Sequence, residues 1–181
     1  MPDGDSIKPR VLIVDDSPDC IDLLVEALSD EYAVVVAKNG AKALTLAENQ
    51  TPDLILLDVR MPIMDGYEVC RVLKANPLTR RIPVLFVTGQ SDHDDERKGL
   101  ELGAVDYITK PFQPDLVKAR VRNHLELNLY RNQLEMLVKR QTRELDLTRD
   151  ATIYGLGILA EFRDLETGQH IKRTQSYIGV L

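Results

Sequence analysis

Five polar side chains in this sequence stand where they could together hold a divalent cation and a phosphoryl group. Asp15 with Asp16, Asp58 and Thr88 each come directly after four apolar residues, and Lys110 follows a further, shorter strand-like segment, 52 residues beyond Asp58. Unbroken apolar runs are typical of strands buried on both faces of a parallel sheet. Parallel sheets bind ligands outside the carboxyl ends of their strands. If these strands are neighbours, three carboxylates, one hydroxyl and one ammonium group meet in a single pocket.

The chemistry of such a pocket follows from its charges. Three carboxylates at short range repel one another, and at least one stays protonated unless a cation intervenes. Mg²⁺ is the expected cation, because it takes a few carboxylates, keeps water ligands and accepts phosphate oxygens. Lys110 adds a positive point charge suited to phosphate, and Thr88 can donate a hydrogen bond to a phosphoryl oxygen. One carboxylate is then free to attack phosphorus and form an acyl phosphate.

Each of these residues alone is weak evidence, and the prediction depends on their joint occurrence. A pair of aspartates at the end of a strand is commonly a helix cap, and a Lys-Pro pair is nearly uninformative by itself. Four separate strand ends that all carry a suitable polar group are a much more specific pattern.

The elements that must position these groups alternate between strand and helix along the chain. We expect strands at 10–15, 33–37, 53–58, 83–88 and 104–108, and helices that begin at Ser17-Pro18, cover 41–49, begin at Gly66, cover 92–102 and begin at Pro114. Right-handed crossovers between parallel strands place helices on both faces of a sheet. The sequence therefore predicts an α/β fold with a doubly wound, five-stranded parallel sheet.

Length and charge limit the classes of protein that this chain can belong to. Its 181 residues are enough for one ordinary domain and an appendage, and 44% of them are hydrophobic. The net charge is −6, and residues 1–115 contain 21 Asp/Glu against 12 Lys/Arg. An acidic front part argues against nonspecific nucleic-acid binding, and the mildly basic remainder has no Lys/Arg clusters that would favour it. We expect no nucleic-acid partner.

Cysteine use and hydropathy favour a soluble cytoplasmic protein. The two cysteines, Cys20 and Cys70, fall in helical positions and are expected to be buried, reduced thiols. No apolar run approaches the ~20 residues that span a membrane. The first nine residues are polar and lack the apolar stretch of a signal peptide, so we expect a flexible N-terminal tail at 1–9.

The last helical segment continues well past the length of an ordinary helix. It contains no Gly or Pro from Asp115 to about Asp150, and a heptad seam runs along it. Two interpretations remain open: one long solvated helix, or a parallel coiled coil that links two copies into a homodimer. The seam residues, of which four are aliphatic, are Leu127, Arg131, Leu134, Val138, Gln141, Leu145, Thr148 and Thr152.

With these residues in place, residues 10–125 resemble the receiver domain of two-component response regulators. The resemblance implies a flavodoxin-like sheet with strand order 2-1-3-4-5. It also implies that the chain signals through its fifth helix and the coiled coil. The matching residues, in the family's order and spacing, are Asp15-Asp16, Asp58, Met61-Pro62, Asp65-Gly66, Thr88, Tyr107 and Lys110-Pro111-Phe112.

The resemblance also implies roles for the pocket residues. Asp58 would accept a phosphoryl group from a phosphohistidine on a sensor histidine kinase, with Lys110 beside it. Asp15, Asp16 and Asp58 would bind Mg²⁺, with the backbone carbonyl of Arg60 as a further ligand.

Further implied features concern the switch and the lifetime of the phosphate. Thr88 and Tyr107 would form the switch pair, and the peptide between Lys110 and Pro111 would be cis. Arg60 and Gln90 occupy positions that vary in the family and tune how long the phosphate lasts. A guanidinium at Arg60 could shield the phosphoryl group from water.

The end of the sequence suggests a second domain. Glu166 and His170 are four residues apart, a spacing found in metal sites but more often in salt links. The run from Arg163 to Arg173 resembles the opening of HD-GYP phosphodiesterase domains, which hydrolyse cyclic di-GMP at a metal cluster. That family's His-Asp pair and Gly-Tyr-Pro motif are absent. We therefore expect a receiver domain at 10–125, a helical coiled-coil linker at 126–150 and a truncated output-domain fragment at 151–181, without phosphodiesterase activity of its own.

Two other functions remain open at this point. An aspartyl-phosphate hydrolase or transferase also uses an aspartate nucleophile and Mg²⁺. However, enzymes resembling the haloacid dehalogenase family place a second aspartate two residues after the nucleophile, a spacing that Asp15-Asp16-Ser17 lacks. A degenerate receiver could instead act only as a dimerising scaffold, although the complete acidic set with Lys110 disfavours this.

Overall fold

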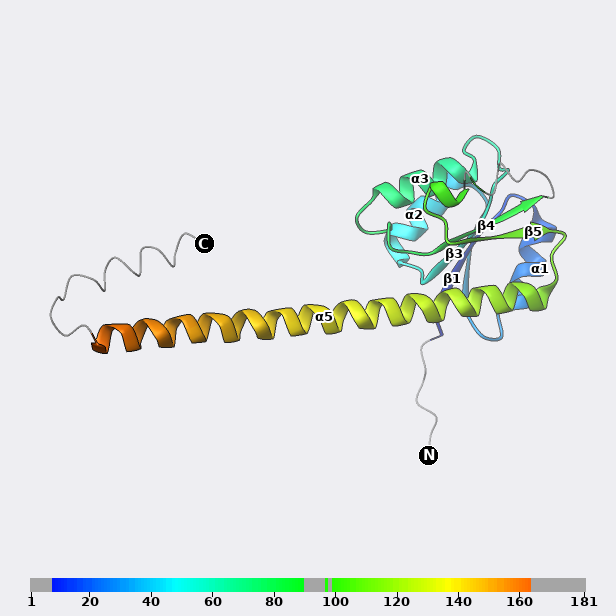
Figure 1. The fold of residues 1–181 in the computed structure, drawn as a ribbon. Helices are drawn as coiled ribbons and strands as arrows, with labels where there is room; N and C mark the ends of the chain where they lie inside the picture. Colours follow the sequence, from blue (N-terminus) through cyan, green and yellow to red (C-terminus); the bar gives the residue numbers. More distant parts are fainter. Residues whose placement is uncertain (1–7, 90–96, 98, 164–181) are drawn as a thin grey trace, which may run out of the picture. The chain divides into compact units, whose positions relative to one another are not determined.

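The computed structural model describes residues 8–89, 97 and 99–163, and its centre is a five-stranded parallel sheet (Figure 1). The strand order is β2-β1-β3-β4-β5, which confirms the expected doubly wound, flavodoxin-like topology. The elements are β1 Arg10–Val14, α1 Pro18–Leu28, β2 Ala33–Ala37, α2 Gly40–Gln50, β3 Leu54–Asp58, α3 Gly66–Ala75, β4 Val84–Gly89, β5 Asp106–Lys110 and α5 Pro114–Arg163.

Most element boundaries agree with the sequence prediction to within one residue, but the fifth strand is displaced by two. We expected it at 104–108, whereas β5 covers Asp106–Lys110 and so ends on the lysine that was predicted to follow it. The apolar pair Ala104-Val105 attracted the prediction, and the polar start of the strand is tolerated because Asp106 has side-chain partners. The helix expected over 92–102 lies mostly outside the described residues.

The strands direct alternate side chains into two hydrophobic clusters, one on each face of the sheet. In β1, Val11 and Ile13 belong to one cluster, while Leu12 and Val14 belong to the other. Residues of α1 and of the first turns of α5 pack in the cluster with Val11 and Ile13, whereas α2 and α3 pack on the opposite face. Burial on both faces explains why these strands are apolar until their last residues.

The helices that follow the strands begin at polar caps, which fix the ends of the loops around the pocket. Asp65 and Glu68 form a reciprocal capping box at the start of α3, and Asn39 accepts from the Lys42 N–H at the start of α2. Ser17 stands at the cap position of α1, as predicted, but its side chain makes no capping hydrogen bond. Instead, the Ser17 N–H donates to Asp15 Oδ1 at 2.9 Å, so a pocket carboxylate orders this turn.

The last helix, α5, is continuous over 50 residues and extends past the predicted linker end, through Gly155 and Gly157. Its first turns bury Val117 and Val121 in the core. The chain divides into two compact units at Leu129/Tyr130, and the proposed boundaries at 125/126 and 150/151 stay predictions. Among the described residues, no helix has both the length and the apolar character that crossing a membrane requires.

Candidate functional site

Three carboxylates meet at the carboxyl edge of the sheet, because β1 and β3 are neighbours and their ends lie side by side. Oxygens of Asp15, Asp16 and Asp58 all lie within 4.8 Å of one another. Asp15 and Asp58 are only 1% and 5% exposed, whereas Asp16 is exposed. The edge therefore offers two buried carboxylates and one at the surface, all facing the same small volume.

Lys110 reaches this group from the end of β5 and forms ion pairs with both buried aspartates. Its Nζ donates to Asp15 Oδ2 at 2.7 Å and to Asp58 Oδ1 at 2.9 Å. The peptide bond between Lys110 and Pro111 is cis, as the resemblance to receiver domains implied. The lysine thus bridges residues that lie 95 and 52 positions away in the chain.

Burial and charge act together on the protonation of the pocket. Burial raises the pKa of Asp58, the hydrogen bond from Lys110 opposes the rise, and repulsion from Asp15 and Asp16 adds to it. Burial alone would lower the pKa of Lys110, but its hydrogen bonds to Asp15 and Asp58 outweigh burial and raise it. Lys110 is therefore held as a cation, yet its hydrogen bond does not outweigh the effect of burial on Asp58.

Cys20 borders the same pocket, a location that sequence reasoning missed. It was predicted to be a buried thiol, but it is only half-buried, and its pKa is raised to about 12 by burial and by the neighbouring Asp15. Cys70 is fully buried, as expected. Neither cysteine forms a disulfide.

Thr88 and Tyr107, from the neighbouring strands β4 and β5, both line one small cavity of about 10 Å³. Val59, Phe86 and Ala104 are among its other walls. In this structure the Thr88 hydroxyl donates to the Gly89 carbonyl at 3.2 Å. The two residues that the resemblance named as a switch pair are therefore close enough to share a packing space.

The side chain of Arg60 crosses from the end of β3 to the end of β4. A Cβ atom at Gly89 would lie 2.5 Å from Arg60 Nη2, so the guanidinium rests against the glycine backbone next to Thr88. Arg60 also lines an open groove with Asp16, Met61, Pro62 and Asp65, among other residues. Gln90, the other residue expected to tune the phosphate lifetime, lies outside the described residues, as do Glu166 and His170.

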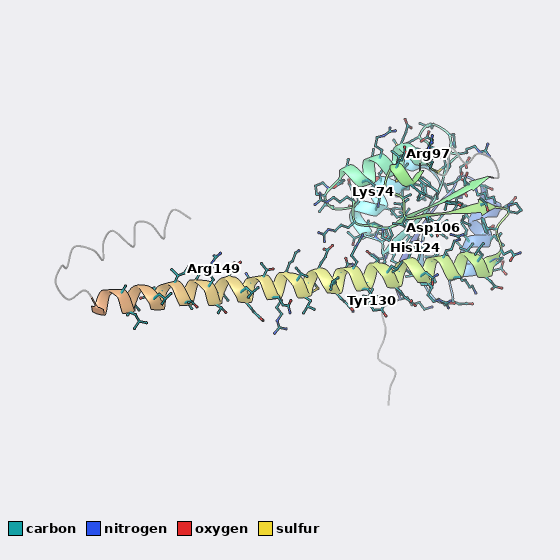
Figure 2. The ribbon with its side chains drawn as sticks, viewed as in Figure 1. Lys74, Arg97, Asp106, His124, Tyr130 and Arg149 are labelled. Carbon is teal, nitrogen blue, oxygen red and sulfur yellow. The ribbon has the colours of Figure 1, made fainter. Side chains whose placement is uncertain are left out.

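A second polar cluster, which the sequence did not reveal, joins β5 to α5 (Figure 2). Asp106 Oδ2 accepts a hydrogen bond from Arg120 Nη1 at 2.6 Å and lies 3.0 Å from His124 Nε2. The same guanidinium lies 6.0 Å from the centre of the Tyr107 ring. Burial would raise the pKa of Asp106, but hydrogen bonds from His124 and Arg120 lower it. The i, i+4 spacing of Arg120 and His124 was the only sequence signal for this cluster.

The donor set of the acidic pocket fits a hard divalent cation. It consists of carboxylate oxygens from Asp15, Asp16 and Asp58, with the backbone of Arg60 two residues farther along the chain. Mg²⁺ prefers oxygen ligands of this kind and retains water, for which the exposed side of Asp16 leaves room. The raised pKa of Asp58 indicates that the site gains from additional positive charge.

Comparisons with known proteins agree with this geometry. The family described as response regulator receiver domain matches residues 11–122. A protein of Vibrio cholerae named "Probable cyclic di-GMP phosphodiesterase" is 47% identical over 178 residues, which cover 94% of this chain and 40% of that protein. Response regulator PleD of Caulobacter vibrioides is 44% identical over 129 residues, 71% of this chain and 28% of that protein. The chain thus spans less than half the length of both relatives.

A solved structure shows the same fold. The chemotaxis protein CheY4 of Vibrio cholerae superimposes with a TM-score of 0.60 at 32% identity, covering 64% of this chain and 98% of that one. The superposed 64% of this chain is close in length to the first compact unit, which contains the sheet and ends at Leu129.

Proposed function

This chain belongs to the response regulator receiver domain family, and from that premise we propose that Asp58 accepts a phosphoryl group from a sensor histidine kinase. The observation that carries the proposal is the meeting of three carboxylates and Lys110 at one edge of the sheet. Asp58 is bonded to Lys110, and its pKa is raised, first by burial and then by repulsion from Asp15 and Asp16. A carboxylate that is poorly compensated in the resting state gains most from new cationic contacts.

In the proposed reaction, a carboxylate oxygen of Asp58 forms a bond to phosphorus while the bond between phosphorus and the donor imidazole breaks. The product is an acyl phosphate, and the imidazole nitrogen takes up a proton. Lys110 keeps its positive charge, because its pKa is raised, and it can move from the carboxylate oxygen to a phosphoryl oxygen. Phosphoryl transfer depends mainly on such positioning and charge stabilisation.

We propose Mg²⁺ as the cofactor, held by Asp15, Asp16 and Asp58 with the carbonyl of Arg60. When bound, the cation supplies positive charge that offsets repulsion among carboxylate and phosphoryl oxygens. Asp15 contributes a second function through its other bonds: it orients Lys110 and accepts from the Ser17 N–H, so its position is fixed from two sides.

The proposed response to phosphorylation involves Thr88 and Tyr107. The Thr88 hydroxyl, bonded in this structure to the Gly89 carbonyl, would turn to a phosphoryl oxygen. That movement would open space in the cavity that both residues line, and the Tyr107 ring would turn inward. Tyr107 neighbours Asp106, which is bonded to α5, so the change can reach that helix.

Acetyl phosphate, a small phosphoryl donor, tests the acceptor directly. Wild type with Mg²⁺ is expected to gain one phosphoryl group by intact-mass spectrometry, Asp58→Asn none, and the exposed α1 variant Asp22→Asn as much as wild type. Excess EDTA should abolish the gain, and added Mg²⁺ should restore it. A labelled Asp58→Asn protein, or an unlabelled wild type, would overturn the proposal and favour a scaffold that acts without phosphorylation.

We further propose that this chain regulates cyclic di-GMP hydrolysis by an output domain and that it forms a parallel homodimer through α5. The name of the Vibrio cholerae relative supports the first part, and the exposed apolar residues of α5 support the second. Residues 1–181 alone are expected to leave cyclic di-GMP intact in a chromatographic assay. Turnover above background would contradict this expectation.

A further inference from the structure

One face of α5 carries a row of apolar side chains that stand in solvent. Leu127, Leu134, Val138, Leu145 and Leu159 are between 54% and 70% exposed. Their spacing in steps of seven and four, with two heptads between Leu145 and Leu159, places them on one side of the helix. An apolar stripe of this length is the seam of a coiled coil, in which each side chain inserts between residues of a facing helix.

Apolar side chains also flank the first half of the seam. Tyr130 and Leu137 flank the seam and are 65% and 52% exposed. They stand immediately before Arg131 and Val138, at the g positions of the heptad in which these two residues occupy a. Apolar g residues add contact area beside the charged Arg131, whose long side chain can direct its head group to water.

Charged residues beside the seam indicate that the helix facing α5 is α5 of a second copy. Glu144 occupies a g position and Arg149 the following e position. In a parallel, unstaggered pair of helices, the g residue of one copy faces the e residue five positions later in the other. Residues five apart do not face each other within one helix, so Glu144 and Arg149 are complementary only across such an interface.

The present partners of these two residues do not prevent that contact. Glu144 accepts from Arg140 at 3.1 Å, and Arg149 pairs with Asp146 at 3.6 Å and Asp150 at 3.1 Å, all as exposed neighbours on the same helix (Figure 2 labels Arg149). Exposed pairs of this kind contribute little to stability and exchange partners readily. A carboxylate also accepts several hydrogen bonds at once.

We propose that α5 pairs with α5 of a second copy as a parallel, unstaggered coiled coil over 127–159, with Glu144 of each copy facing Arg149 of the other. This inference rests on the proposed homodimer and specifies its partner, direction and register. The other three facing pairs in this register, Tyr130 with Glu135, Leu137 with Thr142 and Ala151 with Leu156, contain no like charges. Arg131 at an a position and Gln141 at a d position disfavour larger assemblies and alternative registers, at a cost in stability.

Two charge-reversal variants test this register. Glu144→Arg places like charges opposite each other in its own homodimer, and so does Arg149→Glu. Each variant alone is expected to dimerise about tenfold more weakly than wild type, because two attractive pairs become repulsive. In a mixture, all facing pairs are opposite in charge, so the heterodimer should form with wild-type affinity. Sedimentation equilibrium of the full chains, alone and mixed in equal amounts, measures both effects.

The possible outcomes separate this inference from the proposals on which it rests. A dimer whose mixture shows no preference for the heterodimer overturns the register and leaves the dimer standing. A chain that is monomeric at all concentrations overturns both, whereas acceptance of phosphate by Asp58 is measured separately and is unaffected by either result. Circular dichroism of both variants confirms that the helix is still formed.

Cysteine crosslinking provides an independent measurement. Thr148→Cys places a thiol at a d position, where two copies approach closely in the proposed register, and should form an interchain disulfide under mild oxidation. Arg143→Cys places the thiol at an outward f position and should not. The native protein, in which Cys70 is buried and Cys20 half-buried, shows the background. Equal crosslinking of both variants would contradict the register.

Discussion

At the scale of single residues, the Arg60 side chain beside the acidic pocket is expected to affect the lifetime of a phosphoryl group there. Arg60 extends from the end of β3 to the backbone of Gly89, beside Thr88. This path crosses the carboxyl ends of β3 and β4, next to which a phosphoryl group on Asp58 would lie. A guanidinium there can bond to phosphoryl oxygens and keep water from the phosphorus atom.

We therefore predict that Arg60→Ala shortens the lifetime of phosphorylated Asp58. The loss of about 1 kcal/mol of barrier corresponds to a rate roughly fivefold higher, measured as release of inorganic phosphate after acetyl phosphate is removed. Gly89→Ala should act in the same direction with Arg60 still present, because its Cβ would lie 2.5 Å from Nη2 and displace the guanidinium. Unchanged rates in both variants would show that Arg60 does not shield the phosphate.

The Asp106 cluster gives a prediction about pH. The pKa of Asp106 is lowered from 3.8, because hydrogen bonds from His124 and Arg120 outweigh burial. A carboxyl with a lower pKa in the folded state stabilises the fold above its unfolded pKa, and the contribution is lost as pH falls through the folded value. Asp106→Asn should lower the free energy of unfolding by roughly 1–3 kcal/mol at pH 7.

The difference in free energy of unfolding between Asp106→Asn and wild type should narrow as the pH is lowered from about 5 to below 3.8, the usual pKa of an aspartate. Urea titrations at several pH values measure it, with the exposed Asp22→Asn as the control. A deficit that stays constant down to the lowest pH would show that the carboxylate charge contributes nothing to stability.

The residues of the acidic pocket could be located from the sequence, but those of the second cluster could not. Asp15, Asp58 and Lys110 each stand at the end of a strand, and parallel topology alone brings strand ends together. Asp106 instead meets Arg120 and His124 only because α5 crosses β5 at a particular angle. No local pattern encodes that angle, which depends on how Val117 and Val121 pack in the core.

At the scale of elements, the link between β3 and α3 sets the position of Asp58. Gly66 begins α3, and its backbone runs so close to the end of β3 that an added Cβ would collide with the Asp58 carbonyl. The Gly66 N–H also donates to the Val59 carbonyl at 2.9 Å. The glycine is therefore needed for the close approach of two backbones and not for an unusual φ.

Gly66→Ala should move the end of β3 or the start of α3, because neither backbone can yield locally. We expect a loss of more than about 2 kcal/mol in stability together with reduced phosphorylation of Asp58. Gly157→Ala, at an outward f position of α5, is the matched control: nothing lies within 4 Å of its added Cβ, and alanine should stabilise the helix by roughly 0.5–1 kcal/mol. Thermal unfolding and acetyl phosphate labelling give the two readings. A fully stable and active Gly66→Ala protein would contradict the predicted clash.

The order and type of the described strands and helices could be predicted because apolar runs and helical periodicity are local signals. The start of β5 could not, since Asp106 is a polar residue whose place in a strand depends on partners in α5. The heptad pattern identified a long helix, but a helix in isolation does not reveal whether its apolar face has a partner. The structure shows that this face is exposed, and its exposure supports a second copy of α5 as the partner.

At the scale of the whole molecule, α5 is the one described element that contributes to both compact units. Its first turns pack in the core through Val117 and Val121 and bond to Asp106. Its later turns carry the proposed dimer seam. Because backbone hydrogen bonds link each turn of an α-helix to the next, a rotation or shift of the first turns is expected to reach the later turns. Dimer geometry and the state of Asp58 are therefore expected to be coupled.

This coupling predicts that phosphorylation changes the crosslinking of α5. In the Thr148→Cys protein, the rate of disulfide formation should change by at least about twofold when Asp58 is phosphorylated or bound to beryllofluoride. The reason is that a small rotation of each helix moves the two thiols relative to each other. The same protein with Asp58→Asn should not respond, and this control excludes direct effects of the reagents.

If the rate of disulfide formation is identical with and without phosphorylation, while Asp58 is shown to be labelled, then the signal does not travel as a rotation or shift of α5. The output would then have to be controlled through another surface of the receiver domain.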